Sequence, residues 1–240
     1  AYQVHQAENV HIVIHDNEST ALSTENSPPY EESLEFSLLP NANGHNSRIS
    51  SPPPILTARR IDRLNELKQN ILSEHPKIKV YTRQLDVRDK STVDQLVSSL
   101  PSDLKEIDVL VNNAGNIIVK GMDKIDNVSS DDIDIMVDTN VKGLLYVTQA
   151  VLPRMKERQK GHIINIGSIS ETEFSFIRFG GDKARADKVY EGITPLTGED
   201  IAETVVFVAS RPDHVNIADV TLYPVNQASV YLVHRPHTKK

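Results

Sequence analysis

The sequence lacks cysteine and tryptophan, and only 5% of its 240 residues are aromatic. The absence of cysteine excludes a disulfide framework and a thiolate metal site, and it fits a reducing compartment, so we expect a cytoplasmic protein. No apolar run approaches the roughly 20 residues that a membrane-spanning helix needs, and we expect no membrane association. The formal net charge of −7 argues against a general nucleic-acid-binding surface.

Glycine is scarce in the first half of the chain, where Gly44, inside a polar tract, is the only glycine before Gly115. A turn that holds a phosphate with its backbone N–H groups relies on glycines that let the ligand approach closely. The sequence before Gly115 therefore predicts no glycine-rich phosphate-binding turn.

Residues 1–54 differ in composition from the rest of the chain, because they hold seven acidic residues, one basic residue and six of the thirteen prolines. Such a segment cannot bury enough apolar surface to offset the entropy that ordering costs. We expect residues 16–54 to be disordered or to act as a linker. Residues 9–15 alternate well enough to predict a short strand.

Three histidines near the N-terminus, His5, His11 and His15, have a spacing that could suit a metal site. On a strand-like run, solvated side chains are the more common reading of His11 and His15. We therefore predict no metal site.

From residue 55 onward, apolar patterns alternate between the periods of strands and helices. Strands are predicted at 55–58, 78–81, 107–112, 162–166 and 219–223. Helices are predicted from Ile61 to a stop before Pro76, across 93–100, across 131–158, and at 181–191 and 198–210, the last opened by a capping pair of Thr197 and Asp200. This alternation predicts an α/β domain over residues 55–240 with a doubly wound, Rossmann-like parallel sheet.

Asn112, Asn113, Ala114 and Gly115 follow a buried apolar strand without a break. Asparagine amides can form hydrogen bonds to neighbouring strands, and the small side chain of alanine leaves space for a ligand. Glycine permits close approach of the ligand to the backbone. Taken alone, such a stretch is more often an ordinary turn. Its surroundings favour a ligand site.

Those surroundings resemble the short-chain dehydrogenase/reductase family, specifically its NADP-dependent 3-hydroxy acid (serine, allo-threonine) dehydrogenases. The resemblance covers roughly residues 55–240 and rests on the order and spacing of several segments. They are Ile55 to Arg60, Leu85-Asp86-Val87, Asn112 to Gly115, Asp138 to Val141, Asn165 to Ile169, Glu171 to Phe174 and Tyr223 to Ser229.

The resemblance implies NADP as the cofactor, because Arg59 and Arg60 follow the strand whose end meets the adenosine ribose, where guanidinium groups recognise a 2′-phosphate. The alternative is that both arginines are solvated residues at the start of a helix and bind no phosphate. Asp86 resembles the residue that contacts the adenine amino group. Asn112, Ala114 and Gly115 would line the cofactor cleft, and Thr172 resembles the residue at the nicotinamide or phosphate end.

Catalysis in the family uses a tyrosine as general acid/base, a lysine that lowers the tyrosine pKa, a serine that binds the substrate oxygen, and an asparagine that supports a proton-relay water. Ser168 matches the serine and Asn140 the asparagine. Arg178 is a candidate carboxylate clamp for the substrate, and a solvated helix residue is an equal alternative. None of the seven tyrosines has a lysine four residues later, so the catalytic pair is absent.

The missing pair indicates a deletion, because Ser168-Ile169-Ser170 runs directly into Glu171-Thr172-Glu173-Phe174. In the family, a helix with the tyrosine and lysine and a further central strand separate these two pieces. Their loss also removes the main oligomer-forming helix and leaves neighbouring strands without ladder partners. A second break lies at the front, where Asp16-Asn17-Glu18 follow residues 9–15 in place of a glycine-rich turn.

Three hypotheses follow. In the first, the chain is an incomplete version of an NADP-dependent 3-hydroxy acid dehydrogenase, inactive as it stands, whose small-molecule substrate is a 3-hydroxy acid. In the second, it is a non-catalytic relative that acts as a binding or regulatory subunit through its remaining helices. In the third, it has no stable fold.

Overall fold

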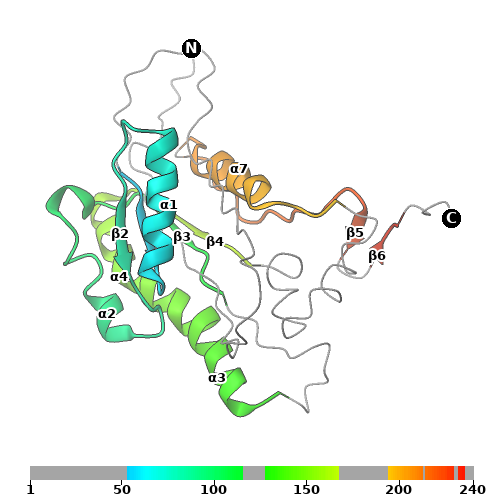
Figure 1. The fold of residues 1–240 in the computed structure, drawn as a ribbon, viewed down its shortest axis with the longest axis horizontal. Helices are drawn as coiled ribbons and strands as arrows, with labels where there is room; N and C mark the ends of the chain where they lie inside the picture. The colour runs from blue at the N-terminus through cyan, green and yellow to red at the C-terminus, as the bar shows by residue number, and fades with distance from the viewer. Residues whose placement is uncertain (1–52, 116–127, 168–193, 213, 230–231, 236–240) are drawn as a thin grey trace.

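The computed structural model describes residues 53–115, 128–167, 194–212, 214–229 and 232–235 (Figure 1). Its strands are β1 Ile55–Ala58, β2 Tyr81–Gln84, β3 Val109–Asn112, β4 His162–Asn165, β5 Gln227–Ser229 and β6 Leu232–Val233. Its helices are α1 Ile61–Glu74, α2 Lys90–Asp94, the 3-10 turn η1 Ser102–Leu104, α3 Ser130–Val137, the π-helical η3 Asp138–Gly143, α4 Leu144–Arg158 and α7 Gly198–Ala209. The predicted strand at 9–15, the predicted disorder at 16–54 except for its last two residues, and the predicted helix at 181–191 lie outside the described residues.

The main strands form two parallel pairs. β1 pairs with β2 and β3 pairs with β4, in both cases in parallel, while β5 and β6 form a small antiparallel pair. Every residue of β1 and β3 is buried, whereas β2 and β4 are only half-buried along most of their length. β1 and β3 are therefore the inner strands, and β2 and β4 the outer ones.

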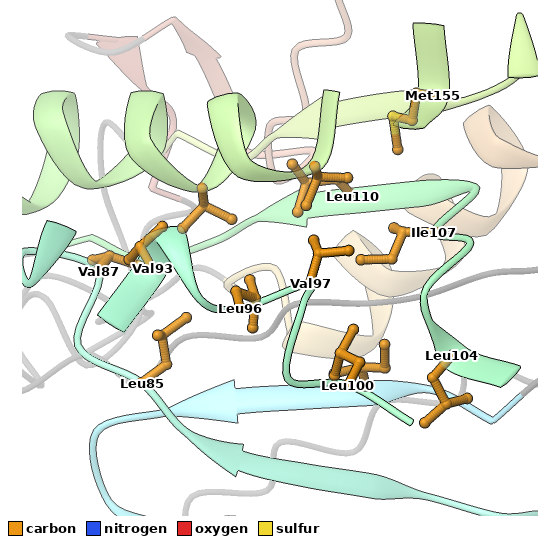
Figure 2. Close-up of a cluster of buried hydrophobic side chains, with 13 residues drawn as sticks. Leu85, Val87, Val93, Leu96, Val97, Leu100, Leu104, Ile107, Leu110 and Met155 are labelled. Carbon is orange, nitrogen blue, oxygen red and sulfur yellow. The ribbon is translucent and has the colours of Figure 1, made fainter. Parts of the chain in front are cut away.

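Helices cover both faces of these strands, and a core cluster lies on each side. The first cluster joins β1 and β3 to α2, η1 and α4, and Figure 2 shows its labelled side chains spread between α4 and the strands on the opposite side of the cluster. The second cluster joins the other face of the same strands to α1 and α7. Figure 1 shows α1 on the near side of the strands and α4 behind them. These two layers of helices around parallel strands confirm the predicted α/β architecture.

A buried ion pair fixes the end of α4 against the start of β3. Arg158 Nη1 donates to Asp108 Oδ1 at 2.5 Å, and Arg158 Nη2 donates to the Ile107 carbonyl at 2.6 Å. Gln159 then takes the left-handed conformation that ends the helix, with φ of 53°. α4 thus runs antiparallel to β3 and returns the chain to the start of β4.

Several predicted boundaries agree with the structure. The strand at 55–58 is confirmed, α1 ends at Glu74 just before Pro76, and the capping box of Thr197 and Asp200 opens α7. The prediction of one helix across 131–158 is correct in extent. A π-helical turn interrupts it, which the apolar period did not reveal.

Other boundaries are wrong. The strand predicted at 78–81 begins only at Tyr81, and the helix predicted across 93–100 ends at Asp94, although its apolar residues Val93, Leu96, Val97 and Leu100 are all buried. Side chains can point into the core from an irregular backbone as well as from a helix. A periodic apolar pattern can therefore extend beyond the last residue of the helix.

The strand predicted at 219–223 does not form, and its residues are exposed. A strand needs a ladder partner for its backbone groups. Within the described residues β4 pairs with β3 alone, so no adjacent strand is present there to receive this segment. The apolar pattern of 219–223 is typical of a strand, but among the described strands none pairs with this segment.

In the part of the chain that the structure describes, no helix is both long and apolar enough to cross a membrane.

Candidate functional site

The carboxyl ends of β3 and β4 are joined by two asparagines that stand opposite each other in the register. The Asn112 amide nitrogen donates to Asn165 Oδ1 at 2.9 Å and to Thr148 Oγ1 of α4 at 3.1 Å. Asn112 itself is buried. The amide therefore ties two strand ends and a helix together at the edge where ligands bind in open parallel sheets.

Sequence reasoning selected Asn112 and missed Asn165 and Thr148 as its partners. Asn165 ends an apolar run in the same way as Asn112, which was the available signal. Thr148 lies within a helical pattern, and nothing in that pattern indicates a role at the strand ends. Ala114 and Gly115 follow Asn112 at this edge and are half-buried, in the place that the resemblance implies.

The carboxyl edge of β1 and β2 carries a group of charges. Asp86 follows β2, and its carboxylate accepts two hydrogen bonds from Arg88 Nε and one from Arg88 Nη2, at 2.6–3.1 Å. Partial burial alone would raise the pKa of Asp86. Hydrogen bonds from Arg88, its charge, and the charge of Arg59 together outweigh burial and hold the Asp86 pKa below its ordinary value.

Arg59 and Arg60 stand between β1 and α1, where Arg60 is the residue that caps the helix. The Arg59 carbonyl accepts a hydrogen bond from Gln84 Nε2 at 2.7 Å, which joins the ends of β1 and β2. The two guanidinium groups thus belong to a helix N-terminus, which itself favours anions. Arg59, Arg60 and Asp86 lie at one strand edge, and their roles in cofactor binding stay predictions.

Asn140 lies in η3, the π-helical turn between α3 and α4. Such turns occur often at functional sites because they redirect side chains from a regular helix. Neighbouring Thr139 is buried, and its hydroxyl has no hydrogen-bond partner among the described residues. At the end of the turn, Gly143 lies so close to Val87 that an added Cβ would stand 2.7 Å from Val87 Cγ2. The turn is therefore packed directly against the segment that follows β2.

Ser168, Thr172 and Arg178 lie outside the described residues, so their predicted roles stay predictions. Within the described ranges, no group of three or more histidine, aspartate or glutamate side chains is placed to hold a metal ion. What the structure brings together is an amide network at the ends of β3 and β4 and a guanidinium–carboxylate group at the ends of β1 and β2.

Comparison with known proteins identifies close relatives. A family model described as short chain dehydrogenase matches residues 54–179. The chain is 40% identical over 227 residues to the NADP-dependent 3-hydroxy acid dehydrogenase YdfG of Salmonella typhi, with 75% of this chain and 89% of that protein covered. It is 33% identical over 233 residues to an NADP-dependent 3-hydroxy acid dehydrogenase of Schizosaccharomyces pombe, with 79% and 89% covered.

Among solved structures, the closed form of a serine dehydrogenase complexed with NADP⁺ matches with a TM-score of 0.66 and 36% identity, covering 77% of this chain and 90% of that one. A serine dehydrogenase from Escherichia coli matches with a TM-score of 0.58 and 35% identity, covering 74% and 89%. These matches confirm the predicted Rossmann-like fold.

The alignments also agree with an internal deletion. The match to the Salmonella protein runs over 227 residues, yet it uses only 75% of this 240-residue chain. The alignment must therefore contain positions that the relative fills and this chain does not. With its family model, its relatives and its fold in agreement, the chain belongs to the short-chain dehydrogenase family.

Proposed function

We propose that this chain carries the framework of an NADP-dependent 3-hydroxy acid dehydrogenase but does not turn over, because it lacks the group that moves the proton. The observation that carries the proposal is the direct step from Ser168 to Glu171 in a chain whose seven tyrosines are never followed by lysine at the fourth position. The relatives at 33–40% identity are named as NADP-dependent 3-hydroxy acid dehydrogenases.

NADP as the cofactor is supported by the arginines at the carboxyl edge of β1. Arg59 acts on the Asp86 carboxylate through its charge, so the two residues share one electrostatic environment. In this proposal Arg59 and Arg60 hold a 2′-phosphate, and Asp86 accepts from the adenine amino group. Asn112, Ala114 and Gly115 line the ribose side of the cleft, and Thr172 meets the nicotinamide end.

When bound, NADP supplies the hydride acceptor for oxidation of a secondary hydroxyl. Ser168 then holds the substrate oxygen, Asn140 supports a relay water, and Arg178 pairs with the substrate carboxylate. The hydroxyl proton still needs a base. A phenol titrates near 10 and serves as that base at neutral pH only beside a cation that lowers its pKa. The chain has neither partner at the family's spacing, so the proton has no acceptor.

A binding role is the second candidate, and one surface favours it. Ile133, Val137, Val141 and Leu145 recur at every fourth position along α3, η3 and α4, and each is 40–51% exposed. A continuous apolar stripe of this kind suits a partner helix. The chain would then act as a non-catalytic subunit.

Adenosine fragments test the cofactor assignment separately from the missing parts of the site. 2′,5′-ADP carries the 2′-phosphate without the bridging pyrophosphate, so its binding does not need a glycine-rich turn. We expect 2′,5′-ADP to bind about tenfold more tightly than 5′-AMP, which corresponds to about 1.4 kcal/mol. The preference should vanish in Arg59→Gln/Arg60→Gln and persist in Arg154→Gln, which changes an exposed arginine of α4.

Intact NADPH should bind much more weakly than it does to a complete family member. We expect a Kd above about 1 mM by fluorescence titration, because no glycine-rich turn is present between Ala1 and β1 to hold the pyrophosphate. The Salmonella relative, titrated in the same buffer, is the positive control. Micromolar binding by this chain would contradict the proposal, as would equal binding of the two fragments.

A further inference from the structure

Asp86, the proposed acceptor for the adenine amino group, already has a strong partner in the chain itself. Arg88 donates its backbone N–H to Oδ1 at 2.9 Å, Nε to Oδ1 at 3.0 Å and to Oδ2 at 3.1 Å, and Nη2 to Oδ2 at 2.6 Å. The Asp86 carbonyl also accepts from the backbone N–H of Asp89 at 3.0 Å. The segment after β2 is therefore a tight turn that the Asp86 side chain closes.

These contacts use the whole acceptor capacity of the Asp86 carboxylate. An ionised carboxylate offers about four lone-pair positions, two on each oxygen. Each oxygen of Asp86 accepts two of the contacts from Arg88, which fills these positions. Burial raises the Asp86 pKa, but the hydrogen bonds and charge of Arg88, together with the charge of Arg59, outweigh burial and lower it. At neutral pH the group is thus an acceptor whose positions are already occupied.

The pair of Asp86 and Arg88 is nevertheless within reach of a ligand. Their side chains are 32% and 34% exposed. The Leu85 N–H donates to the Ala58 carbonyl at 2.8 Å, which holds the start of the turn against the end of β1. Arg59 follows Ala58, and its charge acts on the Asp86 carboxylate. An adenosine whose 2′-phosphate is held by Arg59 would therefore bring its base to this pair.

We propose that Arg88 is a specificity-determining residue of this site, because it competes with the adenine amino group for Asp86; the inference rests on the function proposed above. The amino group can bond to Asp86 only after Arg88 releases at least one of its contacts. A bond from a guanidinium joins two charges, whereas a bond from the neutral amino group joins one charge to a dipole, so Arg88 is the stronger partner. Adenine therefore gains little from its amino group while Arg88 is in place.

Two nucleotides that differ only in the base test the proposal by titration calorimetry on the full chain. The probes are 2′,5′-ADP and 2′,5′-IDP, in which hypoxanthine carries a carbonyl oxygen in place of the amino group. We expect their Kd values to differ by no more than about threefold in the unmutated chain. Arg88→Met removes the side-chain donors and keeps an unbranched stem, so the freed carboxylate should favour adenine by about tenfold, which corresponds to about 1.4 kcal/mol.

Two further variants show whether the change acts through Asp86. Arg154→Gln, which changes an exposed arginine of α4, should leave the ratio of the two Kd values as it is in the unmutated chain. Asp86→Ala/Arg88→Met should bring the ratio back to about one, because the gain needs the carboxylate that Arg88 had occupied. Loss of the Arg88 charge weakens the binding of both nucleotides alike, so the ratio reports the competition and not the charge.

A ratio that Arg88→Met leaves unchanged or lowers would overturn the proposal, because Arg88 would then orient Asp86 for adenine instead of competing with it. A raised ratio that persists in Asp86→Ala/Arg88→Met would overturn it as well, since the effect would not pass through the carboxylate. The preference for 2′,5′-ADP over 5′-AMP tests the cofactor assignment separately. If that preference is present while the base ratio does not respond to Arg88→Met, this inference fails and the cofactor assignment stands.

Discussion

At the scale of single residues, buried polar groups hold the two ends of β3 in different ways. At the carboxyl end, the Asn112 amide makes neutral hydrogen bonds to Asn165 and Thr148. At the amino end, Asp108 is 2% exposed and faces two cations, Arg158 at 2.5 Å and Lys160 at 3.8 Å. The neutral amides can orient a ligand without a strong electrostatic field. The buried Asp108 carboxylate, in contrast, makes the stability of β3 depend on the cation that pairs with it.

Removal of one partner of the buried pair should therefore be costly. We expect Asp108→Ala to lower the free energy of unfolding by about 3–5 kcal/mol, because Arg158 would keep a charge without its partner. In the double variant Asp108→Leu/Arg158→Met the loss should be smaller, since no unpaired charge is left. Denaturant unfolding measures both. A loss below about 1 kcal/mol for Asp108→Ala would show that the pair does not hold α4 to β3.

At the scale of elements, the ends of helices show which parts of the fold follow from local sequence. Thr197 and Asp200 predicted the start of α7 because a capping box is a contact between near neighbours. The π-turn at Asp138–Gly143 was not predicted, since it depends on packing against Val87, which is distant in sequence. The absence of a strand at 219–223 could not be predicted either. An apolar pattern typical of a strand does not indicate whether a second strand lies beside it to pair with.

The same contrast holds within the candidate site. Asn112 could be selected because it ends an apolar strand, whereas Asp86 and the two arginines were selected through the resemblance to the family. The hydrogen-bond partners of Asn112 could not, because Thr148 reaches it through the packing of α4 and Asn165 through strand register. Sequence pattern places residues along an edge, and tertiary packing decides which of them touch.

The close contact at the π-turn predicts a specific cost for a small change. Gly143→Ala places a methyl group 2.7 Å from Val87 Cγ2, an overlap that costs about 1–3 kcal/mol and is only partly offset by the roughly 1 kcal/mol better helix propensity of alanine. We expect a net loss of stability of up to about 2 kcal/mol. Gly198→Ala is the matched control, because a Cβ at that helix start meets no atom within 4 Å. Thermal unfolding of both variants measures the difference, and equal effects would contradict the packing argument.

The start of α2 predicts a dependence on pH. Hydrogen bonds from the Thr92 and Ser91 side chains and backbone N–H groups lower the pKa of the capping residue Asp89 from 3.8 to about 2. Because the folded pKa is lower, the carboxylate stabilises the fold fully above about pH 4, and this contribution is lost as pH falls toward 2. The stability difference between the chain and Asp89→Ala should shrink between pH 7 and pH 2.5. A difference that stays constant over this range would show that the carboxylate charge is not involved.

At the scale of the whole molecule, apolar side chains are exposed along residues 219–223. β4 is only half-buried, in contrast to β3. In the segment predicted as a strand at 219–223, Val220, Leu222 and Tyr223 are 37–45% exposed. Unpaired strand edges and exposed β-forming segments are templates for association between copies.

Positive charges introduced into residues 219–223 should reduce association between copies of the chain without changing the stability of the core. We expect Val220→Lys/Leu222→Lys to lower light scattering at a given concentration and temperature, with a change in unfolding free energy within about 0.5 kcal/mol, because both side chains already face solvent. A matched pair of substitutions in the exposed part of α1, Gln69→Lys/Asn70→Lys, adds the same two positive charges without touching the segment and should have less effect on scattering. Equal reductions would indicate that net charge alone controls association.

The central claim is that this member of the short-chain dehydrogenase family holds a recognisable site without the acid/base that drives turnover. The most direct test is NADPH consumption by the purified chain in the presence of a small 3-oxo acid, with the Salmonella relative as the active control. We expect a rate at least about 10²–10⁴-fold below that of the active control, since a positioned acid/base alone contributes a factor of that size. Sustained consumption at about 1 s⁻¹ or faster, within the usual range of enzymes, would contradict the claim.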